Sequence, residues 1–210
     1  MRKTMLWKLI LFVGPLLILQ GAKCPGIPEM EDVSVTAVAE EYVDLEFEAR
    51  GSINAESDVV TIDIDDLREE LEDNDIDVGT IDTVVVHSIL YGVTAYNEAE
   101  TDRSIVNGRL ELTRLDTDES AVLFDDVDVA VHPLLGELVA PPLAPGGVGF
   151  LNELMGDVLE ALHTGTPSEF AVTGAVSGQS EPTERETNFD WRVRIYYQVA
   201  GEVEVERPSF

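Results

Sequence analysis

Apolar and polar residues alternate with a period of two along most of this chain from Val33 onward. The clearest example is Tyr42–Arg50, where four apolar residues alternate with four charged ones. This pattern is typical of a β-strand that buries one face and exposes the other. Asp58–Asp65 and Phe189–Val199 alternate in the same way. Thr83–Tyr96 is apolar on both faces, which predicts a strand that lies centrally in its sheet or is covered on both sides.

Further strands are predicted over other stretches of the chain. Ile105–Leu115 contains an Asn-Gly pair, which indicates a bulge or a tight bend. Two short strands follow at 122–124 and 127–131. Phe170–Val176 and Phe189–Val199 flank a polar loop, and we expect these two strands to pair as a late hairpin.

Two helices interrupt the strands. Residues 149–163 carry apolar side chains three and four positions apart, with acidic side chains on the other face, which predicts a long amphipathic helix. A shorter helix is predicted over 66–72, with Asp65 as its N-cap. The preceding stretch 133–147 is apolar and broken by prolines, and Gly146–Gly149 is interpreted as a flexible hinge.

These elements predict a mainly β fold. Short strands separated by turns about every dozen residues favour an antiparallel β-sandwich or curved sheet of about seven to nine strands. The helix at 149–163 would cover one face or end, and the helix at 66–72 would be a minor addition. The chain length favours one acidic β-rich domain, residues 33–210, after a short linker at 25–32.

Composition changes sharply at residue 24. The first 24 residues contain four basic residues and no acidic one, whereas the remainder contains nine arginines, no lysine and 42 acidic residues, a formal charge of −33. Residues 1–24 are therefore predicted to be a signal peptide, with a cationic start, an apolar run of 11 residues at Leu9–Leu19, and small or polar residues at 20–22. A membrane-spanning helix needs roughly 20 apolar residues, so export is favoured over a permanent anchor.

The cysteine at the end of this leader points to a known class of exported protein. Cys24, the only cysteine, follows Gly21, Ala22 and Lys23. With its apolar run and this cysteine, the segment resembles the signal of a bacterial exported lipoprotein, although that family has a large aliphatic residue first and a small residue last in the three positions. The resemblance implies that Cys24 is lipidated and holds the domain at a membrane surface. Ordinary cleavage after Ala22 is the alternative.

The acidic body is interpreted as adaptation to high salt. Carboxylates spread over the whole body, together with the loss of lysine, favour a solvated surface over a few specific binding sites. At 1 M salt the Debye length falls to ~3 Å, so the repulsion between such carboxylates is small. Nucleic acid and anionic lipid headgroups are excluded as partners, because the body lacks the basic patch that they require.

One acidic cluster is a candidate calcium site. Asp116, Asp118 and Ser120 match the opening of a calcium-binding loop, but the sixth position is Ala121 and the twelfth is Val127, where that loop has glycine and glutamate. We therefore expect no cofactor and no metal, with Ca²⁺ at these three residues as the alternative.

The sequence offers no catalytic motif. His87, His132 and His163 are too far apart for metal-ligand spacing, and no nucleophile turn or phosphate loop is present. His87 lies in a strand that is apolar on both faces, which favours a buried core or interface histidine. We therefore do not predict an enzyme.

Apolar residues around the long helix suggest one possible ligand site. They would line a pocket for a lipid or another hydrophobic ligand between the 149–163 helix and the sheet. The alternative is that they complete the core. These residues are Leu134, Leu138, Leu143, Phe150 and Met155.

The leading functional hypothesis is an exported cell-envelope module with a structural or protein-interaction role. Its partner would be another envelope protein, together with a membrane if Cys24 is lipidated. Arg192 and Arg194 are rare cations on an acidic body and suggest a partner face, unless they neutralise carboxylates across the sheet. A carrier of a hydrophobic ligand is the alternative function.

Overall fold

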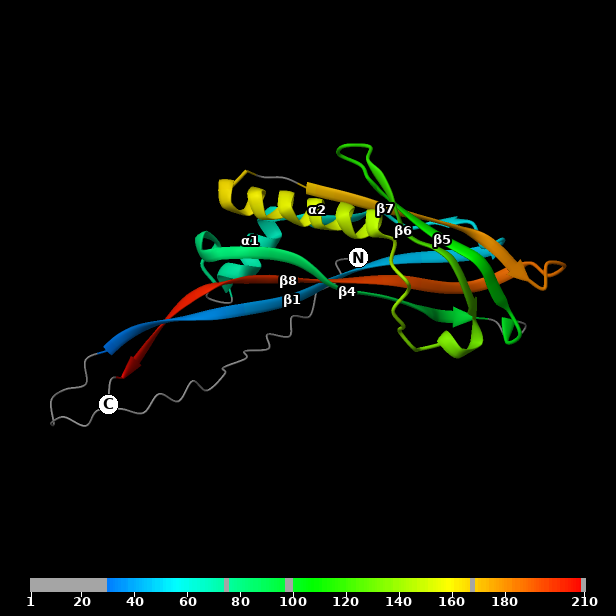
Figure 1. Ribbon diagram of the computed structural model, residues 1–210, viewed down its shortest axis with the longest axis horizontal. Coiled ribbons are helices and arrows are strands. Elements are labelled where there is room, and N and C mark those ends of the chain that lie inside the picture. Colours follow the sequence, from blue (N-terminus) through cyan, green and yellow to red (C-terminus); the bar gives the residue numbers. More distant parts are fainter. Residues whose placement is uncertain (1–29, 74–75, 97–99, 167–168, 209–210) are drawn as a thin grey trace.

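Two antiparallel sheets and two α-helices form the fold (Figure 1). The computed structural model describes residues 30–73, 76–96, 100–166 and 169–208, with side chains described from residue 38 to residue 201 of these ranges. The mainly β prediction, with one long and one short helix, is confirmed. The elements are β1 (Met30–Gly51), β2 (Ala55–Glu56), β3 (Val60–Asp63), α1 (Ile64–Asp73), η1 (Val78–Thr80), β4 (Ile81–Tyr96), β5 (Ser104–Arg114), β6 (Ser120–Ala130), η3 (His132–Leu134), α2 (Pro145–Thr164), β7 (Glu169–Glu181) and β8 (Thr187–Pro208).

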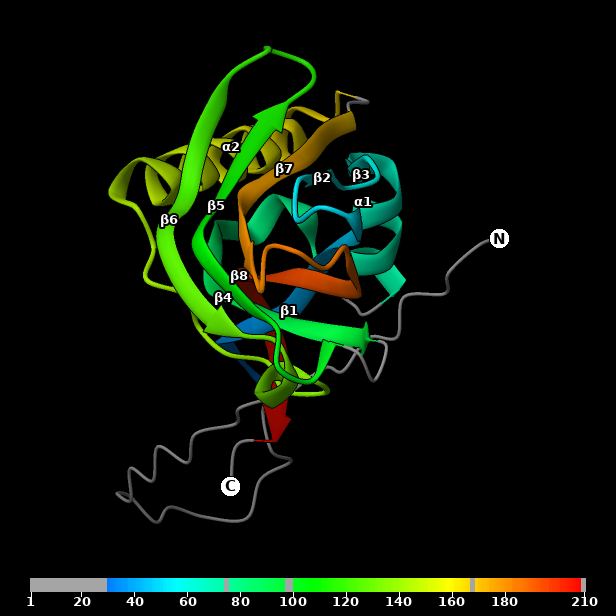
Figure 2. The same cartoon turned by 90° about the vertical axis from the view of Figure 1, so that its right-hand side faces the viewer.

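The first sheet has the order β1-β8-β4, and the second has the order β2-β7-β5-β6, with β3 also paired to β7. Figure 2 shows β5, β6 and β7 curving over β8 and β1, so that the buried faces of the two sheets enclose the core. Alternate residues of β8 from Phe189 to Val199 are buried, as their alternation in the sequence predicts. The core is therefore made by the inward faces of both sheets together with α2.

The pair β1 and β8 is the longest element of the fold. Their register runs without a break from Met30 opposite Pro208 to Gly51 opposite Thr187. β4 pairs with β8 only as far as Gly201. The outer ends of β1 and β8 therefore continue as a two-stranded ribbon, which extends to the lower left in Figure 1.

The predicted hairpin of β7 with β8 is wrong. β7 pairs with β2, β3 and β5 in one sheet, whereas β8 pairs with β1 and β4 in the other. The segment between them carries the chain from one sheet to the other. Alternation identified both strands, but it contains no information about which strands pair.

Of the two arrangements predicted for β4, a central position or coverage on both sides, the central position is wrong, since β4 lies at an edge of its sheet. Its pairing with β8 has three register shifts, one of them between Val86 and Ser88. Each bulge changes which residues of the strand face the core, so that apolar residues occur at both alternating positions. His87 lies at the second shift and is exposed, which corrects the expectation of a buried histidine.

The long helix begins earlier than predicted. Pro145 is in its first turn, and the glycines that suggested a hinge are helical. A Cβ atom on Gly147 would lie 2.5 Å from the carbonyl oxygen of Val122, so the missing side chain allows the first turn of α2 to pack directly on β6. Gly165 ends the helix with φ 65°, as expected for a C-terminal glycine.

The short helix also begins earlier than predicted. Asp63, rather than Asp65, caps it, because one Asp63 oxygen accepts hydrogen bonds from the backbone N–H groups of Asp65 (2.9 Å) and Asp66 (3.3 Å). The helix buries Ile64, Leu67 and Leu71.

Candidate functional site

The five residues predicted to line a pocket beside the long helix are not gathered in one place. Leu134 lines a cavity between the two sheets, while Met155 lines a separate void of about 20 Å³ beneath α2. Phe150 is buried in the core, Leu138 is half-buried, and Leu143 is exposed. The apolar face of α2 packs closely on the sheets, so the void that remains under it is small.

The candidate calcium residues are engaged with other groups. Both carboxylate oxygens of Asp116 accept hydrogen bonds from Arg114, at 3.1 and 2.6 Å, and this interaction lowers the pKa of Asp116 below its ordinary value. The hydroxyl of Ser120 lies 2.8 Å from that of Thr113, and Asp118 is exposed in the loop between β5 and β6. Across the described ranges, no three His, Cys, Asp or Glu side chains are grouped to hold a metal ion. Cys24 lies outside the described residues.

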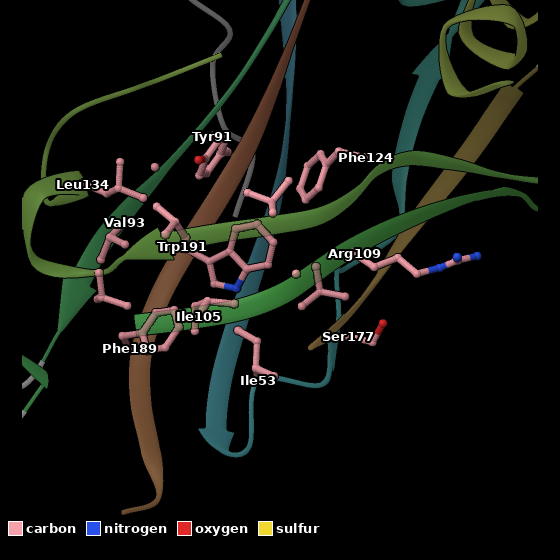
Figure 3. Close-up of a pocket in the computed structure, with 16 residues that line it drawn as sticks. Ile53, Tyr91, Val93, Ile105, Arg109, Phe124, Leu134, Ser177, Phe189 and Trp191 are labelled. Carbon is pink, nitrogen blue, oxygen red and sulfur yellow. The ribbon is translucent and has the colours of Figure 1, made fainter. Parts of the chain in front are cut away.

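The cavity that Leu134 lines is larger than the void beneath α2. It has a volume of about 50 Å³ and is lined by residues of both sheets and by η3, as Figure 3 shows. Most of its lining is apolar and buried. The lining residues are Ile53, Tyr91, Gly92, Val93, Ile105, Gly108, Arg109, Phe124, Val127, Val129, Val131, Leu134, Val176, Ser177, Phe189 and Trp191.

One wall of this cavity comes from the segment 131–139. This segment leads from β6 to the edge of β4 that does not pair with β8. The backbones of Tyr91 and Val139 exchange two hydrogen bonds of 2.9 Å, and Gly136 donates to the carbonyl of Val93 at 3.1 Å. A Cβ atom on Gly92 would lie 2.0 Å from the carbonyl oxygen of Glu137, so the close approach of this segment requires glycine. The spacing of elements in the sequence contained no signal for this contact.

Trp191 lies in the middle of the cavity lining (Figure 3). Its side chain is buried, with 8% of its surface exposed, and one face stacks on Phe47. Among the described residues, none accepts a hydrogen bond from its indole N–H. A buried N–H without an acceptor costs about 1–3 kcal/mol.

The outer face of the β1-β8-β4 sheet carries an aromatic and charged cluster. The guanidinium of Arg194 lies over the ring of Tyr42, 4.0 Å from its centroid, and 5.9 Å from the ring of Tyr196. Arg194 also donates two hydrogen bonds to Asp44, at 2.7 and 2.8 Å, which raise the pKa of Arg194 above its ordinary value. Arg192 donates to the same carboxylate at 3.2 Å. We call Tyr42, Asp44, Arg194 and Tyr196 the outer-face cluster.

Arginines throughout the described part of the chain are neutralised in this way. Each of the eight arginines with a described side chain has a carboxylate within 4 Å, so none of them forms a free basic patch. The pairs are Arg50 with Asp190, Arg68 with Asp65, Arg103 with Glu100, Arg109 with Glu111 and Asp125, Arg114 with Asp116 and Asp157, Arg185 with Asp102, and Arg192 and Arg194 with Asp44.

One of these pairs is fully buried and was missed by the sequence analysis. The side chains of Glu100 and Arg103 are 3% and 0% exposed, and the Nε atom of Arg103 lies 2.5 Å from a Glu100 oxygen. The remaining donors of Arg103 reach the backbone carbonyls of Pro182, Arg185 and Glu186. This pair therefore holds the segment that joins β7 to β8. Their i, i+3 spacing is the one sequence signal for it.

A second buried acidic feature lies near α1. Glu41 is 5% exposed and occupies an inward position of β1, opposite Tyr197 of β8. Burial, followed by repulsion from Glu70, raises the pKa of Glu41 to about 7. Burial, followed by repulsion from Asp66 and Asp73, raises the pKa of Glu70 to about 7. Sequence patterns did not reveal Glu41, because the alternation that predicts this strand starts at Tyr42. Glu41 nevertheless occupies a core position of β1.

No protein-family model and no curated protein matches the chain. Within the part of the chain that the structure describes, no helix has the length and apolar character to span a membrane.

Proposed function

We propose that this protein is an exported, salt-adapted interaction module of the cell envelope, which recognises another protein through the outer face of the β1-β8-β4 sheet. The outer-face cluster is the observation that carries this proposal. Tyrosine and arginine are enriched among the residues that dominate protein interfaces, since both supply a large contact area with polar groups at the tip.

The surroundings of the cluster support an interface. Val38 and Val85 lie on the same face as Tyr42, and all three are 37–40% exposed. None of the described helices or strands packs over this face, because α2 and the second sheet lie on its opposite side (Figure 1). Exposed apolar side chains on an uncovered sheet face favour an interaction site.

The charges around the cluster indicate the chemistry of the partner. The charge of Arg194 is balanced by Asp44, so the centre of the face is aromatic and close to neutral. Glu40, Glu46 and Glu48 lie along β1 on the same side. A partner with an apolar centre and a basic rim complements this pattern. A second copy of this chain is disfavoured as the partner, because it would bring two strongly acidic bodies together.

Photo-crosslinking in intact envelopes tests the proposal. A photoreactive residue is placed at Tyr42 and, as the control, at Leu115, which is exposed in the turn that follows β5. We expect one discrete adduct from position 42, none from position 115, and a weaker adduct when Arg194→Ala is added. Equal labelling from both positions, no adduct from position 42, or an adduct with a second copy of the chain would contradict the proposal.

Export is tested separately by mass spectrometry of the mature protein. A diacylglyceryl group on Cys24 is expected for lipoprotein processing, and a new N-terminus at Lys23 for ordinary cleavage. An intact leader on the native protein would refute export, whatever the crosslinking shows.

A further inference from the structure

We propose that the free edge of β1, at residues 43–48, pairs with an extended segment of a partner protein that carries lysine or arginine at alternate positions. The segment adds to the β1-β8-β4 sheet as a further strand. This inference rests on the proposed function, because it specifies how the envelope partner engages the same sheet. Tyr42 and Asp44 of the outer-face cluster belong to β1 and lie next to the added strand.

The edge of β1 that faces away from β8 has no strand beside it in the described part of the chain. β1 is the outermost strand of the β1-β8-β4 order, and its register with β8 has no bulge from Met30 to Gly51. In an antiparallel edge strand, alternate residues direct both the backbone N–H and the C=O away from the sheet. β1 contains no proline to interrupt this row. Such a long, regular edge is a template for another strand.

The other sheet edges are protected. The segment 131–139 covers the outer edge of β4, where the backbones of Tyr91 and Val139 exchange hydrogen bonds. At the edge of β6, Leu123 accepts a hydrogen bond of 2.9 Å from Ala144, and the first turn of α2 packs on the same strand. The opposite edge of that sheet consists of β2 and β3, which are two and four residues long. Among the described strands, β1 therefore offers the longest edge without such protection.

An acidic hollow of about 400 Å³ lies against β1. Arg50 pairs with Asp190 and lies 3.8 Å from Glu48, so one arginine offsets part of the acidic charge. The hollow keeps a net negative charge, because its lining carries carboxylates from β1, from the segment that follows it and from β8. A cationic side chain of an added strand is therefore favoured there. These carboxylates are Glu46, Glu48, Glu56, Asp58 and Asp190.

The charges of β1 determine the sequence of the added strand. Side chains of paired strands lie opposite each other, where unlike charges stabilise the pair and like charges destabilise it. A second copy of β1 would place carboxylates against Glu46 and Glu48, which are both exposed. Lysine or arginine at alternate positions would instead complement them. The intervening residues of the added strand would lie on the side of Leu45 and Phe47, which favours apolar residues there.

Three short blocked peptides of equal length test the inference on the full chain. In the first, lysine and valine alternate. In the second, glutamate replaces lysine. The third is the lysine–valine peptide with methyl groups on successive central backbone nitrogens, which removes donors from both of its edges because successive N–H groups point to opposite sides. The titrations use the lowest NaCl concentration at which circular dichroism shows the same fold as in molar salt. Amide exchange of β1 is followed by NMR.

We expect the lysine–valine peptide to bind saturably and to slow the exchange of alternate amides within residues 43–48. It should bind at least about tenfold more tightly than the N-methylated peptide, which loses several main-chain hydrogen bonds. The glutamate–valine peptide should show no saturable binding. Equal affinity of the methylated peptide, equal affinity of the glutamate peptide, protection of β4 or β6 instead of β1, or no saturable binding by the lysine–valine peptide would overturn the inference.

A pair of variants tests the contribution of the hollow. Glu56→Lys replaces an exposed attraction with a repulsion and should weaken binding of the lysine–valine peptide about fivefold. Glu153→Lys, an exposed change on α2 outside the hollow, alters the net charge equally and should leave the affinity unchanged. Equal weakening by both variants would show a general charge effect and contradict the assigned site.

The strand addition and the envelope interface fail separately. A photo-crosslinked adduct from position 42, without protection of β1 by the lysine–valine peptide, would overturn the strand addition and leave the outer face as the interface. Protection of residues 43–48, without any adduct from position 42, would contradict the envelope partner and support the edge as a strand-binding site.

Discussion

Phe47 on β1 and Trp191 on β8 lie opposite each other in the strand register, and their rings stack with centroids 4.4 Å apart and planes inclined by 16°. Trp191 therefore belongs both to the core and to the cavity wall. One face of its ring stacks on Phe47, and the same side chain lines the cavity. Aromatic pairs of this kind contribute about 0.5–1.5 kcal/mol beyond their buried area.

We predict that Phe47→Leu destabilises the protein by about 2 kcal/mol, since it removes both the stack and part of the buried volume. Phe150→Leu on α2, also buried, is the volume control and should cost less, because no ring stacks on Phe150 among the described contacts. Denaturant unfolding measures both variants. A cost for Phe47→Leu no greater than that for Phe150→Leu would show that the stack contributes nothing.

The buried Glu100–Arg103 pair predicts an asymmetric response to mutation. Glu100→Gln leaves the charge of Arg103 buried without its counter-ion, which should destabilise the protein by about 3–5 kcal/mol. Asp102→Asn breaks the neighbouring but exposed pair with Arg185 and should change stability little. Thermal melts of the two variants provide the comparison, and similar behaviour of both would argue that burial of the first pair is energetically unimportant.

Glu41 and Glu70 predict a loss of stability between about pH 4.5 and pH 7. Because their folded pKa values are raised from 4.5 to about 7, the folded state binds their protons more tightly than the unfolded state does. The stabilising contribution is therefore complete below the unfolded pKa and is lost as the pH rises through the folded pKa.

Glu41→Gln should remove the part of this pH dependence that comes from Glu41 and stabilise the protein above pH 7 by about 2 kcal/mol, since the neutral amide does not need to ionise in a buried position, while the part from Glu70 remains. Glu69→Gln, an exposed change on α1, is the control. Unfolding free energies at pH 5 and pH 8 measure the effect. An identical pH profile for Glu41→Gln and the unsubstituted protein would contradict the assigned shift.

Salt should stabilise the folded protein. With 42 acidic residues and nine arginines after residue 24, carboxylate repulsion dominates in dilute buffer and is screened in molar salt. We expect the thermal midpoint to rise steeply with NaCl into the molar range. A midpoint that responds only to micromolar Ca²⁺ would instead favour specific metal binding.

Residue patterns alone determined most of the strands, the two helices and the inward face of β8, because alternation and helical spacing are local properties of the chain. The two short strands predicted at 122–124 and 127–131 are a single strand, β6, and the two-residue strand β2 was not predicted. These patterns also determined which residues of Tyr42–Arg50 face the core and where α2 ends, at Gly165. In each of these cases the residue's own conformational preference or burial decides the outcome.

Tertiary structure decided what local patterns cannot contain: the partner of each strand, and which distant residues meet. It placed β7 and β8 in different sheets, moved β4 to an edge, and separated Leu134 from Met155. It also brought Trp191, Ile105 and Leu134 together around one cavity, and Tyr42 next to Arg194 on the outer face. These contacts depend on strand pairing and packing across the core, in which residues far apart in the sequence come into contact without any common sequence signal.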